Sequence, residues 1–259
     1  MSWFTIFLLI TSGLFVGFIN TLAGGGTAIS IAVLMMLGLP ANVANGTNRI
    51  AVIFQNITSV QAFGKKDLIP WRKSTLLSIP TIIGSVLGAW IAVDINESFF
   101  RKAMAVIMLI MLFFVIVKPS VWLKERKHLT EKPVSWLEVL IFFLIGIYGG
   151  FIQIGVGYYL LAGIVLGSGF DLVRANAIKV YIVLLYTLAA IVVFILNKQV
   201  HWEYGLIHSL GNIGGAWIAS RMAIKRGVGF VRWMIIVIIL VFSADLLGLI
   251  SIKQLIMNM

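Results

Sequence analysis

The sequence contains no cysteine and few charged residues. Of its 259 residues, 11% are charged, only nine are Asp or Glu, and five are proline. The missing cysteines exclude a disulfide, a thiol nucleophile and a Cys-ligated metal. Soluble globular domains carry about 25% charged residues. The low charge therefore excludes an ordinary soluble domain and directs attention to the apolar part of the chain.

Long apolar runs are what the chain has in abundance, and 61% of its residues are hydrophobic. Runs that span or nearly span about 30 Å of hydrocarbon lie at 3–22, 44–63, 74–93, 99–117, 136–152, 180–196, 204–221 and 229–250. The first run lacks a basic leader and a cleavage site, so we interpret it as a retained helix. We predict an all-α polytopic membrane protein whose partner is the lipid bilayer and not a nucleic acid.

Two glycine-rich breaks interrupt this pattern, at Asn20–Thr27 (NTLAGGGT) and at Phe151–Tyr158 (FIQIGVGY). Each is followed by a short apolar stretch, 27–39 or 158–170. About a dozen residues form only some 18 Å of helix, which predicts half-helices. Unwound backbone inside a membrane must be buried in protein or line a cavity. A half-helix would aim its free N–H groups and positive dipole end into the break, which favours an anion site.

The two halves of the chain are similar in sequence at an offset of 131 residues. The offset pairs rare residues, namely Gly24 with Gly155, Gly26 with Gly157, Asn45 with Asn176, Trp71 with Trp202 and Arg101 with Arg232. Internal repeats of this kind are typical of secondary transporters. We predict repeat one at 1–118, a basic linker loop at 119–135 and repeat two at 136–259. Five helical elements in each repeat, with an odd number of crossings, predict that the repeats are inverted.

Basic residues are distributed unevenly between the loops. Alternating the loops puts fifteen of the 20 Lys and Arg residues on one face: Lys65, Lys66, Arg72, Lys73, Lys118, Lys124, Arg126, Lys127, Lys132, Arg174, Lys179, Arg221, Lys225, Arg226 and Arg232. Cytoplasmic loops are rich in Lys and Arg. We expect this face to be cytoplasmic, both termini to lie outside, and the protein to reside in the cell membrane.

Small residues four positions apart recur in the predicted helices. The pairs are Gly13 and Gly17, Gly84 and Gly88, Gly146 and Gly150, and Gly211 and Gly215. Such pairs let helix backbones approach closely. We interpret them as packing contacts and not as ligand contacts.

Polar residues mark the starts of two equivalent helices. Asn45 and Asn176 either cap these helices or face one another across the repeat axis. Asn48 and Lys179 are equivalent one turn further in, where capping no longer applies. Lys179 and Arg49 either bind an anion or snorkel from the membrane edge.

Gln55 and Asn56 lie further along the first of these helices. Polar side chains at that depth either bridge helices or line a path through the protein. The residues alone leave both uses open.

Catalytic and metal-binding motifs are missing. Neither glycine break continues into a P-loop, the three histidines have no ligand spacing, and no nucleophile elbow occurs. The sequence GVGYY at 155–159 is not repeated as a potassium filter requires. We expect no enzyme activity, no cofactor and no metal.

Several motifs resemble the TauE/SafE family of sulfite-exporter-like membrane permeases. They are GFINTLAGGGT at 17–27, LGLP at 37–40, ANGTNR at 44–49, GKKD at 64–67 and GVG at 155–157. The resemblance covers nearly the whole chain. It implies transport of a small sulfur-containing or organic anion, such as sulfite, sulfoacetate or another sulfonate.

Together these observations predict a secondary transporter that exports such an anion by alternating access of two inverted repeats. An anion channel with the same central site is the alternative, and an interaction or structural membrane protein is a third reading. The oligomeric state stays open, a homo-oligomer included. The predicted anion site comprises Asn20, Gly24, Gly25, Gly26, Thr27, Asn45, Asn48, Arg49, Gln153, Gly155, Gly157, Tyr158, Asn176 and Lys179.

Overall fold

The computed structural model describes residues 1–94 and 126–246, and every element in these two ranges is helical. The elements are α1 (Trp3–Leu22), α2 (Thr27–Met36), α3 (Ala41–Gly64), α4 (Trp71–Asp94), α6 (Lys127–Thr130), α7 (Trp136–Phe151), α8 (Val156–Ala162), a π-helical segment η2 (Gly163–Gly167), α9 (Leu172–Leu196) and α10 (Trp202–Leu246). The predicted span at 99–117 lies outside the described residues. The prediction of an all-α fold is confirmed for residues 1–94 and 126–246.

Several helices have the length and composition of membrane spans. Trp3–Leu22, Trp71–Val93 and Leu172–Leu196 are long and apolar enough to cross a bilayer. The helix α3 is 24 residues long but carries several amides and an arginine. Within α10 the backbone of Gly227 is not helical (φ 71°, ψ −165°). This break lies between the spans predicted at 204–221 and 229–250.

The starts of the helices correct one of the sequence interpretations. Pro40 is the N-cap of α3, and the carboxylate of Asp171 caps α9 by accepting from the N–H groups of Val173 and Arg174 at 2.8 and 3.1 Å. Asn45 and Asn176 therefore lie inside their helices. The interpretation of these two residues as N-caps is wrong, because each helix begins several residues earlier than its apolar run.

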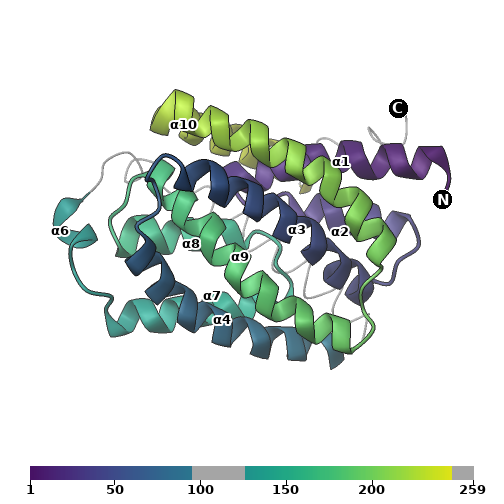
Figure 1. Cartoon of the computed structure of the whole chain (residues 1–259), viewed down its shortest axis with the longest axis horizontal. Helices are drawn as coiled ribbons and strands as arrows, with labels where there is room; N and C mark the ends of the chain where they lie inside the picture. The colour runs from purple at the N-terminus through teal and green to yellow at the C-terminus, as the bar shows by residue number, and fades with distance from the viewer. Residues whose placement is uncertain (95–125, 247–259) are drawn as a thin grey trace.

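The long helices form a row of packed neighbours (Figure 1). The helix α1 packs along α10, α10 along α3, α3 along α9, α9 along α4, and α4 along α7. The helices α3 and α9 therefore lie in the middle, between the α1/α10 pair and the α4/α7 pair. The half-helices α2 and α8 extend from the ends of α1 and α7 toward this centre.

Glycines make the closest of these helix contacts. A Cβ atom at Gly13 or Gly17 would overlap backbone atoms of α10, and one at Gly211 or Gly215 would overlap backbone atoms of α1. The same relation holds for α4 and α7, whose glycines are Gly84, Gly88, Gly146 and Gly150. The predicted packing role of all four pairs is confirmed.

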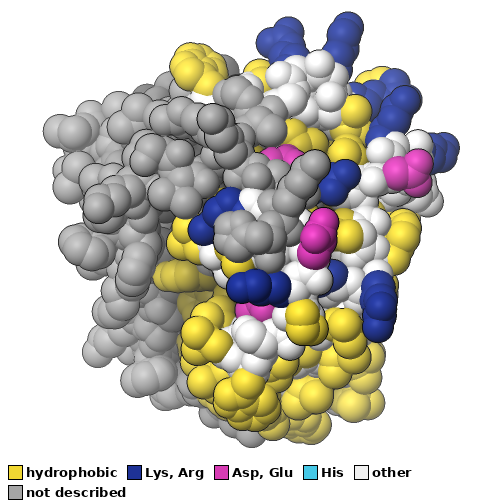
Figure 2. Space-filling model, turned by 90° about the vertical axis from the view of Figure 1, so that its left-hand side faces the viewer, with side chains coloured by type: hydrophobic (Ala, Val, Ile, Leu, Met, Phe, Trp, Pro, Cys, Tyr) yellow, Lys and Arg dark blue, Asp and Glu magenta, His cyan; other side chains and the backbone are white. Residues whose placement is uncertain are grey.

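Basic loops gather at one end of the molecule. The Nζ atom of Lys73, at the start of α4, donates to the carbonyl of Leu129 at 2.9 Å. Arg126 donates to the carbonyl of Leu166 at 3.0 Å. The start of α4, the segment 126–130 and the segment η2 are therefore held together. Figure 2 looks onto this end and shows Lys and Arg side chains spread over it.

Candidate functional site

Both glycine breaks are unwound, as the sequence predicts. The helix α1 ends at Leu22 and α2 begins at Thr27, with Gly24 in the left-handed region between them (φ 97°). The helix α7 ends at Phe151 and α8 begins at Val156, after Gln153 (φ 60°) and Gly155 (φ 66°). Left-handed backbone is costly for most residues and free for glycine. Gln153 is therefore held in its conformation by its surroundings.

The two breaks touch each other. A Cβ atom on Gly24 would overlap the Cα atom of Gly157, and a Cβ atom on Gly157 would overlap the Cα atom of Gly24. The backbone is buried at both positions. Residues 133 positions apart in the chain thus form a direct backbone contact. Only glycine at both positions permits this approach.

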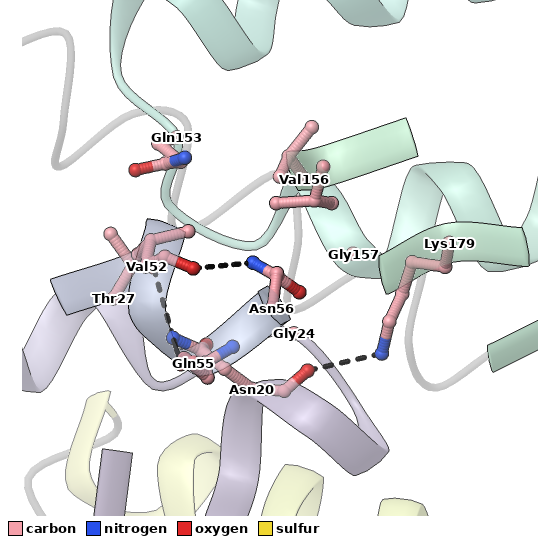
Figure 3. A pocket seen from close by; sticks show the side chains of 11 residues that line it. Asn20, Gly24, Thr27, Val52, Gln55, Asn56, Gln153, Val156, Gly157 and Lys179 are labelled. Atoms are coloured by element: carbon pink, nitrogen blue, oxygen red, sulfur yellow. Dashed lines mark hydrogen bonds between the residues drawn. The ribbon is translucent and has the colours of Figure 1, made fainter. Parts of the chain in front are cut away.

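A cavity lies beside this contact (Figure 3). From the first half of the chain it is lined by Asn20, Gly24, Thr27, Val52, Gln55 and Asn56. From the second half it is lined by Gln153, Val156, Gly157, Lys179 and Val183. The cavity therefore lies where the two halves of the chain meet.

Lys179 brings a charge to the cavity from α9. Its side chain is 1% exposed, and its Nζ atom donates to the carbonyls of Asn20 at 3.0 Å and Thr21 at 2.9 Å and to Oδ1 of Asn176 at 2.7 Å. The two carbonyls belong to the last turn of α1, whose negative dipole end favours a cation. Lys179 thus caps α1 from the other half of the chain.

Arg49 makes the corresponding contact from α3. Its guanidinium is fully buried and donates to the carbonyls of Gly149, at 3.3 Å, and Gly150 in the last turn of α7. It also lies over the ring of Phe194, 4.6 Å from the ring centre. The Nε and Nη1 atoms of Arg49 have no hydrogen-bond partner in the described part of the chain. Both basic side chains point inward, so the interpretation of Arg49 and Lys179 as snorkelling anchors is wrong.

None of the carboxylates in the described ranges is a partner of these two cations. An unpaired charge in a protein interior costs several kcal/mol unless other groups compensate it. Carbonyl groups compensate Lys179 and Arg49 only in part. The pair therefore leaves positive charge near the centre of the protein.

The start of α2 adds hydrogen-bond donors beside the cavity, because its first residue, Thr27, belongs to the lining. Within residues 1–94 and 126–246, the N–H groups of Gly25, Gly26, Thr27 and Ala28 donate to no backbone carbonyl. Gly26 is the N-cap and provides no side-chain acceptor. Free N–H groups at a helix start are suited to an anion.

Amide side chains complete the surroundings of the cavity. The Nδ2 atom of Asn20 lies 3.4 Å from both Thr27 Oγ1 and Gln55 Oε1. Asn56 donates to the carbonyl of Val52, one turn earlier in α3, at 2.7 Å (Figure 3). Gln55 therefore does both things that the sequence left open, since it bridges helices and lines the cavity.

Gln153 connects the second break to α3 and α9. Its Nε2 atom donates to Thr187 Oγ1 at 2.9 Å and to the hydroxyl of Tyr186 at 3.3 Å. Its Oε1 atom accepts from Asn48 at 3.3 Å. These bonds account for the left-handed backbone of Gln153. They also place Asn48 behind the cavity wall and not in it.

The predicted site residues fall into three groups. Those that line the cavity are Asn20, Gly24, Thr27, Gln153, Gly157 and Lys179. Those beside it are Gly25, Gly26 and Gly155, which form the breaks, and Tyr158, which lies in the first turn of α8 against Gly25. The other four lie behind the cavity wall and hydrogen-bond to groups in it or next to it: Asn45, Asn48, Arg49 and Asn176. Asn45, for example, donates to the carbonyl of Phe151 at 2.9 Å.

The predicted site omitted five lining residues, namely Val52, Gln55, Asn56, Val156 and Val183. For Gln55 and Asn56 the sequence left open whether they bridge helices or line a path. The sequence repeat could have indicated two of the five, because Val52 and Val183 are equivalent at the offset of 131 residues. The described residues contain no group of three His, Cys, Asp or Glu side chains that could hold a metal ion.

Comparison with known proteins gives one family. The model of the sulfite exporter TauE/SafE family matches residues 9–246. A probable membrane transporter protein of Haemophilus influenzae is 27% identical over 92% of this chain and 93% of its own length. The probable membrane transporter protein YfcA of Escherichia coli K12 is also 27% identical, over 89% of this chain and 85% of its own. No solved structure matches significantly.

Proposed function

Because the chain belongs to the TauE/SafE family of multi-pass membrane transporters, we propose that it exports a small anion, sulfite or an organosulfonate, as a secondary transporter. The observation that carries this proposal is Lys179, a buried cation in the wall of a small cavity with no carboxylate partner in the described ranges. A fixed positive charge disfavours a cationic solute there. An anion would compensate it.

In this proposal the anion lies between the first break and the side chains of α3. Its oxygens accept from the hydroxyl of Thr27 and from amides at the cavity wall, such as Gln55 and Asn56. The free N–H groups at the start of α2 supply further donors. Lys179 contributes charge, since its own donors are already used by Asn20, Thr21 and Asn176.

The remaining predicted site residues have positioning roles in this proposal. Arg49 and Asn45 fix the end of α7, and Asn176 orients Lys179. Asn48 holds Gln153 in place. Gly25, Gly26, Gly155 and Tyr158 shape the two breaks.

We further propose that repeat one (1–118) and repeat two (136–259) are inverted copies that rock against each other. The helix packing supports this proposal. At the offset of 131 residues, α7 is the counterpart of α1, and the first part of α10 is the counterpart of α4. Accordingly, α1 packs on α10 and α7 packs on α4. Gly24 and Gly155, equivalent at the offset of 131, are both left-handed. In this arrangement the basic end of the molecule faces the cytoplasm and both termini lie outside.

Flux into proteoliposomes tests the proposal. The purified full-length chain is reconstituted, and the uptake of labelled sulfite, sulfate, thiosulfate, sulfoacetate and taurine is measured against empty liposomes. We expect saturable uptake of at least one anion, accelerated when the same unlabelled anion is loaded inside. Uptake that neither saturates nor shows this exchange would indicate the channel instead. No uptake of any anion would contradict both readings.

A further inference from the structure

Building on the proposed function, we infer that the cavity selects an anion with a single negative charge, such as hydrogensulfite or a simple sulfonate, and discriminates against dianions of the same size. Of the eleven residues that line the cavity, Lys179 is the only one with a charged side chain. The others present amides, one hydroxyl, glycine backbone and valine methyl groups. The lining therefore carries a net charge of one.

The contacts of Lys179 indicate that its amine is protonated. Three acceptors surround Nζ, at 2.7, 2.9 and 3.0 Å. An ammonium group has three N–H donors and no acceptor, which matches this arrangement, whereas a neutral amine has only two donors. The same three bonds leave no donor for the solute. Lys179 therefore acts on the solute through its charge and not through a direct hydrogen bond.

The helix ends at the first break do not change this charge balance. The last turn of α1 and the first turn of α2 meet there, on either side of Gly24. A helix carries about half a negative charge at its C-terminus and about half a positive charge at its N-terminus. The two partial charges have opposite signs and largely cancel. The positive charge of Lys179 remains.

Arg49 does not supply a second charge to the lining. It is absent from the cavity wall, and its guanidinium lies between the carbonyls at the end of α7 and the ring of Phe194. The first negative charge of a solute is thus compensated by Lys179, and a second would face only neutral dipoles in the cavity lining. An uncompensated buried charge is strongly disfavoured. A dianion is therefore penalised even where its shape fits.

A matched pair of anions tests this inference. Methanesulfonate and sulfate differ by one methyl group in place of one oxygen, so they have similar size and shape but one and two negative charges. Competition with the transported anion is measured in proteoliposomes at fixed ionic strength. We expect methanesulfonate to compete at least about tenfold better than sulfate, because a second charge is unpaired. Equal competition, or better competition by sulfate, would overturn the inference. Failure of every anion to compete or be transported would instead overturn the proposed function.

A charge variant makes the test independent of solute shape. Val183 lines the cavity one turn after Lys179 on α9. Val183→Lys adds a second cation to the lining, and Val183→Met is the matched control that adds a long side chain without charge. We expect Val183→Lys, but not Val183→Met, to shift the ratio of sulfate to methanesulfonate competition toward sulfate by about tenfold or more. An unchanged ratio in a folded Val183→Lys protein would contradict the inference. If that variant does not fold, the wild-type pair still decides.

Discussion

Gly24 and Gly157 meet backbone to backbone, so that a side chain on either residue would overlap the Cα atom of the other. This contact joins the two glycine breaks and closes one side of the cavity. It predicts that neither glycine tolerates even a methyl group.

We expect Gly24→Ala to destabilise the protein and to abolish transport. Forcing a methyl group into a filled space costs about 1–3 kcal/mol, and left-handed backbone costs Ala about 1–2 kcal/mol more. Gly38 is the matched control, because its φ of 94° is similar to the 97° of Gly24 but a Cβ atom added to it would meet no described atom within 4 Å. Gly38→Ala should show only the backbone cost. Thermal unfolding in detergent measures the stability of both variants, and equal losses of stability would show that the contact with Gly157 is unimportant.

The close packing of α1 on α10 gives a second prediction. A Cβ atom at Gly211 would overlap the backbone of Ile10, whereas the nearest atom to one at Gly214 is 3.7 Å away. We expect Gly211→Ala to cost about 1–3 kcal/mol of stability by separating the helices. Gly214→Ala on the same helix should be neutral or stabilising, because Ala favours helix by about 1 kcal/mol over Gly. Similar unfolding temperatures for the two variants would argue against this interface.

The proposed topology can be read by cysteine labelling, since the chain has no cysteine of its own. Lys66 and Arg226 are exposed at the basic end, and Lys198 is exposed in the loop before α10. In intact cells, a membrane-impermeant maleimide should label Lys198→Cys but not Lys66→Cys or Arg226→Cys. Permeabilised cells provide the control, because all three should then react. Labelling of Lys66→Cys and Arg226→Cys from opposite sides would contradict the inverted repeats.

The half-helices and the four glycine pairs could be predicted because they depend on local pattern. A dozen apolar residues after a glycine run cannot span a bilayer, and glycines four apart lie on one helix face. The structure confirms both. The same local reasoning failed for Asn45, because Pro40 starts the helix ahead of the apolar run on which the interpretation relied.

The contacts of Arg49 and Lys179 could not be predicted from local pattern. Each side chain binds carbonyls at the end of a helix from the other half of the chain, at least 100 residues away in sequence. Such contacts depend on which helix ends the tertiary fold brings within reach. The sequence showed two cations near the breaks, but only the packing distinguishes Lys179, which lines the cavity, from Arg49, which does not.

The central claim is that Lys179 provides the charge that holds the anion, and its most direct test is concentration-dependent flux through Lys179→Met in proteoliposomes. Methionine keeps most of the apolar stem but removes the charge and the cap of α1. Arg49→Met removes the equivalent cap of α7 outside the cavity, so it separates loss of a cap from loss of charge at the site. At matched protein levels we predict that Lys179→Met raises the half-saturating concentration by about tenfold to a hundredfold, corresponding to about 1–3 kcal/mol of lost charge–charge attraction, and that Arg49→Met raises it much less. An unchanged half-saturating concentration in Lys179→Met, or an equal rise in both variants, would contradict the claim.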